Sequence, residues 1–254
     1  MSKKILILTS DPKSVNYEII KKSLSFFRKK KNNEYLFIGC EKNFNKYVTK
    51  SKKIKILHVN YQNKKKYLEN SFDIACKLII EKKAHGLINL PLNKKDLFGK
   101  KYPGVTEFIS KKFNCSGKET MLLYGDRFSV SLNTTHIKLK NVSKKINKKK
   151  IINNIKNIYQ FYRNILDIKK PKIAILGFNP HNGMDLNGSI EEKKIIIPAI
   201  KKIKTLNIIG PLSADTAFIN IKEKGINCIV GNYHDQVLPT FKYANNFKGI
   251  NITL

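Results

Sequence analysis

The sequence predicts an α/β fold with largely parallel sheets. Short apolar runs rich in Ile, Leu and Val recur along the chain, as is typical of buried strands. Amphipathic, lysine-studded stretches alternate with these runs, and strands that alternate with helices form parallel sheets. The chain has 254 residues, 41% of them hydrophobic, so it is long enough for two ordinary domains and can bury a core.

Four strands and three helices are predicted in the first half of the chain. The strands span residues 4–9, 34–39, 54–59 and 86–90, and the helices span residues 17–30, 72–83 and 104–113. Helical spacing places Ile74, Leu78 and Ile79 on one face of the second helix, which predicts that this face is buried. The fourth apolar run ends at Pro91.

Five strands and two helices are predicted in the second half. The strands span residues 120–125, 128–135, 172–178, 226–231 and 249–254, and the helices span residues 143–166 and 190–203. Ser143 could cap the long helix. We place a boundary near Gly125, which divides the chain into an N-terminal α/β domain, residues 1–125, and a second α/β domain, residues 126–254.

Positive charge dominates the composition. Fifty Lys and Arg against 18 Asp and Glu give a formal net charge of +32. A basic surface attracts nucleic acid through phosphate contacts. However, the only arginines are Arg28, Arg127 and Arg163, the lysines are scattered, and no zinc-finger or RNA-binding signature is present. We therefore attribute the positive charge to AT-rich codons, which encode many lysines, and not to a specific nucleic-acid partner. Polyanion binding stays open as an alternative.

Targeting and redox signals predict a cytoplasmic protein that does not enter the membrane. No apolar run approaches the roughly 18 residues that a membrane span needs, and the first one stops at Asp11-Pro12 without a signal-peptide cleavage pattern. The cysteines are far apart and form no Cys-x-x-Cys motif, which favours reduced, mostly buried thiols. They are Cys40, Cys76, Cys115 and Cys228.

Three of the five histidines directly follow predicted strands. They are His136, His181 and His234, whereas His58 and His85 lie within or just before a strand and are interpreted as structural. Ligands of parallel α/β sheets bind beyond the carboxyl ends of the strands. Three imidazoles can hold a divalent metal and leave a position open for substrate. The alternative interpretation is three unrelated loop histidines, because the sequence does not show that they converge.

Two carboxylates accompany these histidines. Asp235 adjoins His234 and could orient it or act in acid–base chemistry. Asp215 lies in the loop Gly210-Pro211-Leu212-Ser213-Ala214-Asp215-Thr216, and its alternative role is a helix cap. Asn93 and Lys94 follow another strand, but an Asn-Lys pair is weak evidence of a site in so lysine-rich a chain.

An ordered set of motifs resembles the 4-hydroxythreonine-4-phosphate dehydrogenase (PdxA) family of vitamin B6 synthesis. The resemblance runs from about residue 85 to the end, and more faintly from residue 1. Each motif is a modest signal, and their shared order and spacing carry the match. The motifs are Pro91-Leu92-Asn93-Lys94, Pro103-Gly104-Val105-Thr106-Glu107-Phe108, Thr134-Thr135-His136-Ile137, Asn179-Pro180-His181, the Gly210–Thr216 loop, Tyr233-His234-Asp235-Gln236 and Asn251-Ile252-Thr253-Leu254.

The resemblance implies the two-domain fold of the isocitrate and isopropylmalate dehydrogenases, with the active site in the interdomain cleft. It implies a homodimer whose subunits share a divalent metal (Zn, Mg or Co) bound by His136, His181 and His234. Within one protomer, we expect His234 to lie apart from the other two. The matching substrate positions are Thr106, Lys242 and Asn251, and Asp215 and Asp235 are our catalytic candidates.

The implied reaction is the NAD-dependent oxidation of the 3-hydroxyl of 4-phosphohydroxy-L-threonine. Loss of carbon dioxide then gives 3-amino-2-oxopropyl phosphate. The sequence does not assign NAD-binding residues.

The sequence departs from the family pattern at several positions. Val105 replaces a substrate-contacting histidine, Met184 replaces a common glutamate, and the N-terminal glycine-rich loop reads Ser10-Asp11-Pro12-Lys13-Ser14-Val15-Asn16. The family pattern continues beyond Leu254 with segments that bind substrate and NAD, so we expect poor NAD binding. Two alternatives follow: a relative acting on a four-carbon acid-sugar phosphate, and a non-catalytic relative.

Overall fold

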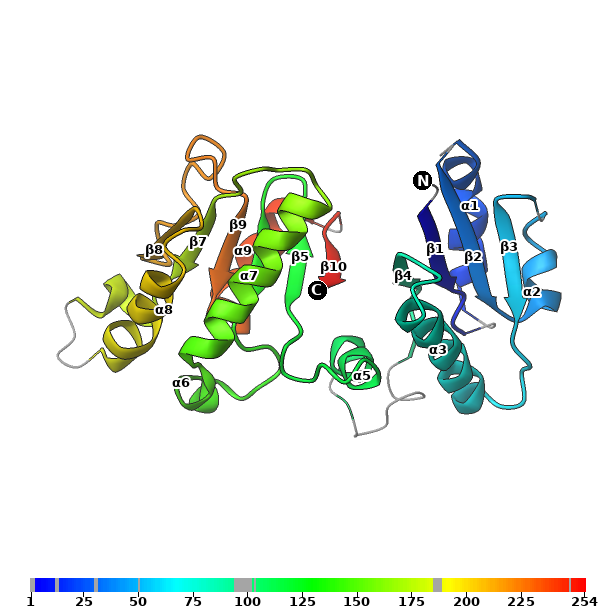
Figure 1. Ribbon diagram of the computed structural model, residues 1–254, viewed down its shortest axis with the longest axis horizontal. Helices are drawn as coiled ribbons and strands as arrows, with labels where there is room; N and C mark the ends of the chain where they lie inside the picture. The colour runs from blue at the N-terminus through cyan, green and yellow to red at the C-terminus, as the bar shows by residue number, and fades with distance from the viewer. Residues whose placement is uncertain are drawn as a thin grey trace. The chain divides into compact units, whose positions relative to one another are not determined.

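The computed structural model describes residues 3–11, 14–29, 32–49, 51–93, 102, 104–184, 189–246 and 248–254. The chain forms two compact units, residues 1–114 and residues 115–254, each with its own sheet (Figure 1). The predicted boundary at residue 125 is too late, because the strand Met121–Tyr124 pairs within the second sheet. The mixed α/β class with parallel strands is confirmed.

The first unit contains a parallel four-stranded sheet in the order β3-β2-β1-β4. Its strands are β1 (Lys3–Leu8), β2 (Asn33–Gly39), β3 (Ile54–His58) and β4 (Gly86–Asn89). Alternate side chains of β1 enter different cores: Leu6 and Leu8 face one, and Ile7 faces the other. Helices α3 (Lys64–Ile80) and α5 (Val105–Lys112) pack on the first, and α1 (Asn16–Lys29) and α2 (Glu41–Asn45) pack on the second.

The second unit contains a six-stranded sheet in the order β10-β5-β6-β9-β7-β8. Strands β6, β9, β7 and β8 are parallel to one another, whereas β5 is antiparallel to both of its neighbours, β10 and β6. The strands are β5 (Met121–Tyr124), β6 (Ser129–Leu132), β7 (Ile173–Leu176), β8 (Ile208–Leu212), β9 (Cys228–Gly231) and β10 (Ile250–Thr253).

Helical segments cover both faces of the second sheet. Helix α7 (Lys148–Asn164), the π-helix η3 (Glu191–Ile196) and α8 (Ile197–Lys202) pack on one face. Helix α9 (His234–Asn245) packs on the other face, together with buried side chains between β8 and β9.

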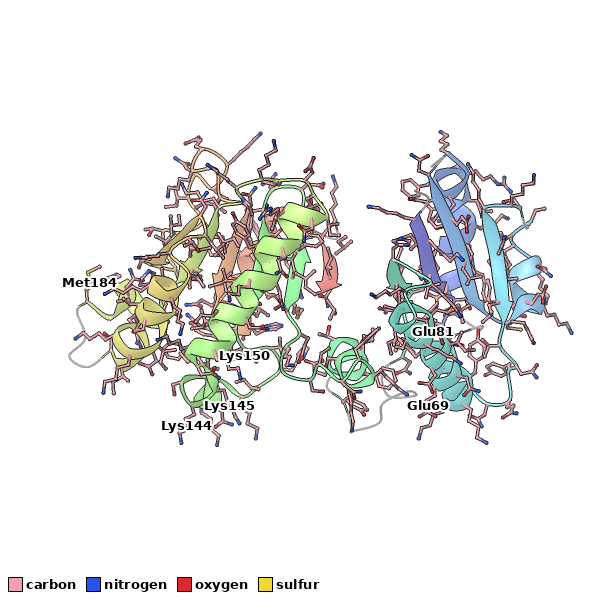
Figure 2. The ribbon with its side chains drawn as sticks, in the orientation of Figure 1. Glu69, Glu81, Lys144, Lys145, Lys150 and Met184 are labelled. Carbon is pink, nitrogen blue, oxygen red and sulfur yellow. The ribbon has the colours of Figure 1, made fainter. Side chains whose placement is uncertain are left out.

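The predicted helix over residues 143–166 is two helices. Helix α6 (Val142–Lys145) ends before Asn147, whose side-chain oxygen accepts a hydrogen bond of 2.9 Å from the amide of Lys150 and caps α7. Ser143 lies inside α6, so the prediction that it caps the long helix is wrong. Lys144 and Lys145 are exposed and, with Lys150, project from this end of the helical segment (Figure 2).

Among the described residues, no helix is long and apolar enough to cross a membrane.

Candidate functional site

Four candidate residues follow neighbouring strands of the second sheet. Strands β6, β9, β7 and β8 lie side by side in parallel, and they are followed by His136, His234, His181 and Asp215, respectively. The carboxyl ends of parallel strands meet at one edge of a sheet. The three histidines therefore belong to one sheet edge, which agrees with their predicted post-strand positions; a shared metal stays a prediction.

His136 and His234 are neighbours within one chain. Their ring centroids lie 6.4 Å apart and the ring planes are inclined by 45°. The expectation that His234 lies apart from the other histidines is therefore wrong with respect to His136. The reason is the direct pairing of β6 with β9, which brings the residues after both strands together.

His234 is also oriented by its neighbour in sequence. It is the first residue of α9, and its Nδ1 lies 2.9 Å from Oδ1 of Asp235. An ionised carboxylate only accepts, so this contact favours the tautomer in which Nδ1 carries the proton and Nε2 keeps its lone pair. Asp235 thus has the geometry of an orienting group, the first of its two predicted roles.

His181 lies beside Asp215. Nε2 of His181 is 4.0 Å from Oδ2 of Asp215, and both side chains are more than half exposed. A hydrogen bond from the Ser213 hydroxyl, with smaller contributions from the Thr216 amide and His181, lowers the pKa of Asp215 below its usual value. Asp215 begins no α-helix, so a helix cap does not explain its position.

A buried amide network joins the three histidine-bearing strand ends, and sequence reasoning missed it. At its centre is Asn232, which is fully buried after β9. Its side-chain nitrogen donates to the carbonyls of Leu176 and Gly177 at the end of β7, at 3.0 and 3.1 Å. Its side-chain oxygen accepts from Asn133, directly after β6, at 3.0 Å.

Further hydrogen bonds extend this network. The Gln236 side chain accepts from the Asn232 amide at 2.7 Å and donates to the Gly177 carbonyl at 2.7 Å. Asn154 of α7 donates to Asn133 at 3.1 Å, and the Thr134 hydroxyl donates to the Asn232 carbonyl at 2.6 Å. The signal available in the sequence was an uncharged amide directly after two of the apolar strands, Asn133 after β6 and Asn232 after β9, where a buried polar group needs a partner.

The three predicted substrate residues lie on different elements. Thr106 is buried in the first turn of α5, in the first unit. Lys242 is exposed on α9, eight residues after His234, a separation of about 12 Å along a helix axis. Asn251 is exposed on β10. Lys94 and Pro103 of the matching motifs lie outside the described residues.

The donor chemistry suits a divalent metal, although the described residues do not bring three such donors together. Within the described ranges, no three His, Cys, Asp or Glu side chains are grouped so that they could hold a metal ion. Imidazole is nevertheless a common ligand for such ions. A three-histidine metal site stays a prediction.

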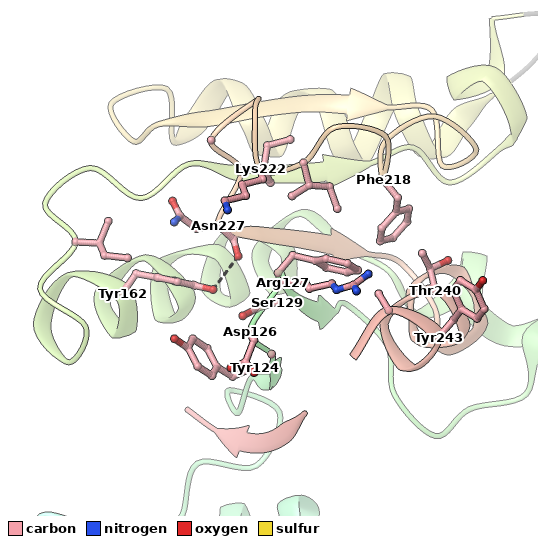
Figure 3. A pocket seen from close by; sticks show the side chains of 17 residues that line it. Tyr124, Asp126, Arg127, Ser129, Tyr162, Phe218, Lys222, Asn227, Thr240 and Tyr243 are labelled. Atoms are coloured by element: carbon pink, nitrogen blue, oxygen red, sulfur yellow. Dashed lines mark hydrogen bonds between the residues drawn. The ribbon is translucent and has the colours of Figure 1, made fainter. Parts of the chain in front are cut away.

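A cavity of about 750 Å³ lies elsewhere on the same sheet (Figure 3). Ser129, which begins β6, and Asn227, directly before β9, line it, so it lies at the amino ends of these strands. The Tyr162 hydroxyl donates a hydrogen bond of 2.8 Å to the Asn227 carbonyl there. Among the described lining residues there is no predicted site residue, so we do not assign this cavity to the reaction.

Comparison with known proteins identifies relatives over nearly the whole chain. The family model described as "Pyridoxal phosphate biosynthetic protein PdxA" matches residues 3–254. The 4-hydroxythreonine-4-phosphate dehydrogenase of Sulfurihydrogenibium sp. (strain YO3AOP1) is 34% identical, over 99% of this chain and 86% of its own length. The enzyme of the same name from Wigglesworthia glossinidia brevipalpis is 39% identical, over 76% of this chain and 59% of its own length.

Solved structures of similar proteins share the fold. A 4-hydroxythreonine-4-phosphate dehydrogenase from Klebsiella pneumoniae superposes with a TM-score of 0.81 at 25% identity, over 99% of this chain and 87% of that chain. A terephthalate 1,2-cis-dihydrodiol dehydrogenase from Burkholderia xenovorans LB400 gives a TM-score of 0.77 at 15% identity, over 100% of this chain and 86% of that chain. The second likeness concerns the fold alone.

Proposed function

The chain belongs to the family of the pyridoxal phosphate biosynthetic protein PdxA, and from this premise we propose that it oxidises 4-phosphohydroxy-L-threonine with NAD. The observation that carries the proposal is the arrangement of His136, His181 and His234 after three neighbouring parallel strands. Relatives bearing the dehydrogenase name match nearly the whole chain, which supports the same reaction class.

The proposed reaction has two steps. In the first, the C3–H bond breaks and its hydride passes to NAD⁺, while the 3-hydroxyl loses its proton and becomes a ketone. In the second, the bond to the carboxylate breaks, carbon dioxide leaves, and the electron pair forms an enolate. A proton then converts the enolate into 3-amino-2-oxopropyl phosphate.

We assign the divalent metal, with Zn, Mg or Co as candidates, to the three histidines. When bound, such an ion lowers the pKa of the substrate hydroxyl and stabilises negative charge on its oxygen. Asp235 holds the His234 imidazole with Nδ1 protonated, which leaves Nε2 for coordination. The ionised Asp215 lies beside His181, where it can orient that ring or accept a proton.

We propose a homodimer whose second copy completes the ligand set. Large apolar side chains are exposed on the two segments that carry His136 and His181: Leu139 is 69% exposed and Met184, which projects outward in Figure 2, is 81% exposed. Apolar surface exposed beside a site is a feature of protein interfaces.

The remaining assignments follow the family. We propose that Thr106, Lys242 and Asn251 bind substrate, with Lys242 supplying a positive charge for its phosphate or carboxylate. We place the reaction in the interdomain cleft of an isocitrate dehydrogenase-like fold and in the cytoplasm. NAD-binding residues remain unassigned.

The test is NADH formation by the purified protein with NAD⁺, a divalent metal and 4-phosphohydroxy-L-threonine. We expect turnover that is lost on chelation and restored by metal. The matched control is His85→Ala, which changes a histidine of the first unit that accepts a hydrogen bond from the Lys4 amide. Turnover abolished by His181→Ala and retained by His85→Ala would support the assignment. No NADH formation by the folded, metal-supplied protein would refute it.

Val105 is the reason to test a second substrate, a four-carbon acid-sugar phosphate. It is the first residue of α5 and packs against the apolar core of the first unit, where an imidazole would add polar groups. If turnover is faster with a four-carbon acid-sugar phosphate than with phosphohydroxythreonine, that second substrate is the correct one.

A further inference from the structure

A buried carboxylate anchors the segment that leads into His181. Glu192 lies in η3 and is only 1% exposed. Its Oε1 accepts hydrogen bonds from the amides of Phe178 and Asn179, at 2.8 and 2.7 Å. Its Oε2 accepts from the side chain of Asn179 at 2.9 Å. Three donors from two adjacent residues thus hold one carboxylate.

Burial of this carboxylate requires those hydrogen bonds. A charged group withdrawn from water is destabilising unless it is paired or hydrogen-bonded. Hydrogen bonds to an ionised acceptor are stronger than those between neutral groups. Glu192 sits in a π-helix, a conformation that is rare and is often found at functional sites. This combination makes Glu192 a strong anchor for residues 178–179.

The turn that follows this anchor is conformationally unfavourable. His181 and Asn182 have φ values of 48° and 59°, in the left-handed region that costs a non-glycine residue about 1 kcal/mol or more. Asn182 lies against Gly177, where an added Cβ would come within 2.3 Å of its side-chain oxygen. Such a turn persists only when the surrounding structure holds it.

The anchored residues 178–179 are close enough to His181 in sequence to determine the direction of its side chain. Only Pro180 separates Asn179 from His181, and the proline ring fixes its own φ. On the other side of the turn, Gly183 packs against Ser189 and Glu192: an added Cβ would meet Ser189 at 2.2 Å and Glu192 Oε2 at 3.3 Å. Glu192 therefore accepts hydrogen bonds from the residues before the His181 turn and lies close to the glycine that follows it.

We propose that Glu192 is a positioning residue, which fixes the His181 turn so that the imidazole is presented for coordination. This inference rests on the proposed function of His181 as a metal ligand. Glu192 itself contacts no reacting group, and it acts through the backbone of residues 178–183.

The test compares Glu192→Gln with Glu191→Gln. Glutamine keeps one acceptor oxygen, but its amide nitrogen faces the Asn179 side chain, which also donates. Glu191 is the adjacent carboxylate in the same π-helix, and it reaches Asn179 only at 3.4 Å. Titration of the metal-free proteins with Co²⁺ should give an affinity lower by ten-fold or more for Glu192→Gln, as is typical for groups that orient ligands, and near wild type for Glu191→Gln.

A second measurement separates positioning from general stabilisation. Hydrogen exchange of the metal-free proteins should become faster at the Phe178 and Asn179 amides in Glu192→Ala, while exchange in β9 stays unchanged. A folded Glu192→Gln protein with wild-type Co²⁺ affinity, or unchanged exchange at both amides in Glu192→Ala, would overturn the inference. If the wild-type protein binds no Co²⁺, the proposed function fails, and the exchange measurement still decides whether Glu192 holds the turn.

Discussion

Replacement of Asn232 by leucine is the sharpest test of the network beneath the histidines. The two side chains have the same number of heavy atoms and the same branching, so the change removes polar groups and creates no cavity. Asn232→Leu deletes two donated bonds, to Leu176 and Gly177, and one accepted bond from Asn133. The Gly177 carbonyl keeps its bond from Gln236, but the Asn133 nitrogen loses its acceptor.

The expected destabilisation is about 3 kcal/mol. An unpartnered buried donor costs roughly 1–3 kcal/mol, and each lost hydrogen bond contributes about 1 kcal/mol, partly offset by added apolar burial. For a unit of this size, 1 kcal/mol corresponds to a shift in melting temperature of about 2–4 °C. We therefore expect Asn232→Leu to lower the melting temperature of the second unit by about 6–12 °C.

Thermal unfolding of four proteins provides the assay: wild type, Asn232→Leu, Asn133→Val and the double variant. Removal of both partners leaves neither half of the Asn133–Asn232 bond orphaned, and the Asn154 donor loses its Asn133 acceptor equally in Asn133→Val and in the double variant. The double variant should therefore be at least about 1 kcal/mol more stable than the sum of the single effects predicts. Single variants within about 0.5 kcal/mol of wild type, or strictly additive effects, would refute the hydrogen-bond reasoning.

His181→Ala should abolish stoichiometric metal binding, measured by calorimetry, and full retention would contradict its role as a ligand. Val105→His should lower KM for phosphohydroxythreonine about ten-fold, since one hydrogen bond to a charged group is worth roughly 1.5–3 kcal/mol; an unchanged KM would indicate a rebuilt pocket. Burial raises the pKa of Cys76 to about 11, so at pH 8 only about 0.1% is thiolate, and mass spectrometry should find native Cys76 resistant to alkylation until the pH approaches that value. Ser213→Ala should raise the depressed pKa of Asp215 toward its usual value in an NMR titration, because the hydroxyl stabilises the ionised form; an unchanged pKa would assign the shift to another group.

Local patterns predicted most strands because their signal is contained in a few residues. Strands β1, β2 and β3 coincide with predicted runs to within one residue, since alternating or continuous apolar side chains reflect burial directly. Helix α3 begins at Lys64, eight residues before its predicted start, because Asn63 caps it and three lysines precede its first buried side chain. The break between α6 and α7 carries no Pro or Gly, so periodicity alone could not locate it.

The sequence indicated the candidate histidines, but it did not indicate the residues that hold them in place. Their positions directly after strands indicated His136, His181 and His234. Residues that follow neighbouring parallel strands lie at the same edge of the sheet. Asn232 and Glu192 hold the segments before these histidines by hydrogen bonds to residues far along the chain or across a turn. Their roles therefore depend on tertiary contacts. In a lysine-rich helix, Glu192 is indistinguishable by sequence from a solvent-exposed carboxylate.

The hydrogen bonds of Asn232 also have an entropic consequence. Fixing the backbone of one residue costs about 1–2 kcal/mol in conformational entropy at room temperature. The ends of β6, β7 and β9 are already joined through Asn232 in the free protein, so that loss occurs when the sheet folds and not when a ligand arrives. A ligand that bound at this edge would then restrict mainly the histidine side chains, with little penalty from ordering the backbone of these strand ends.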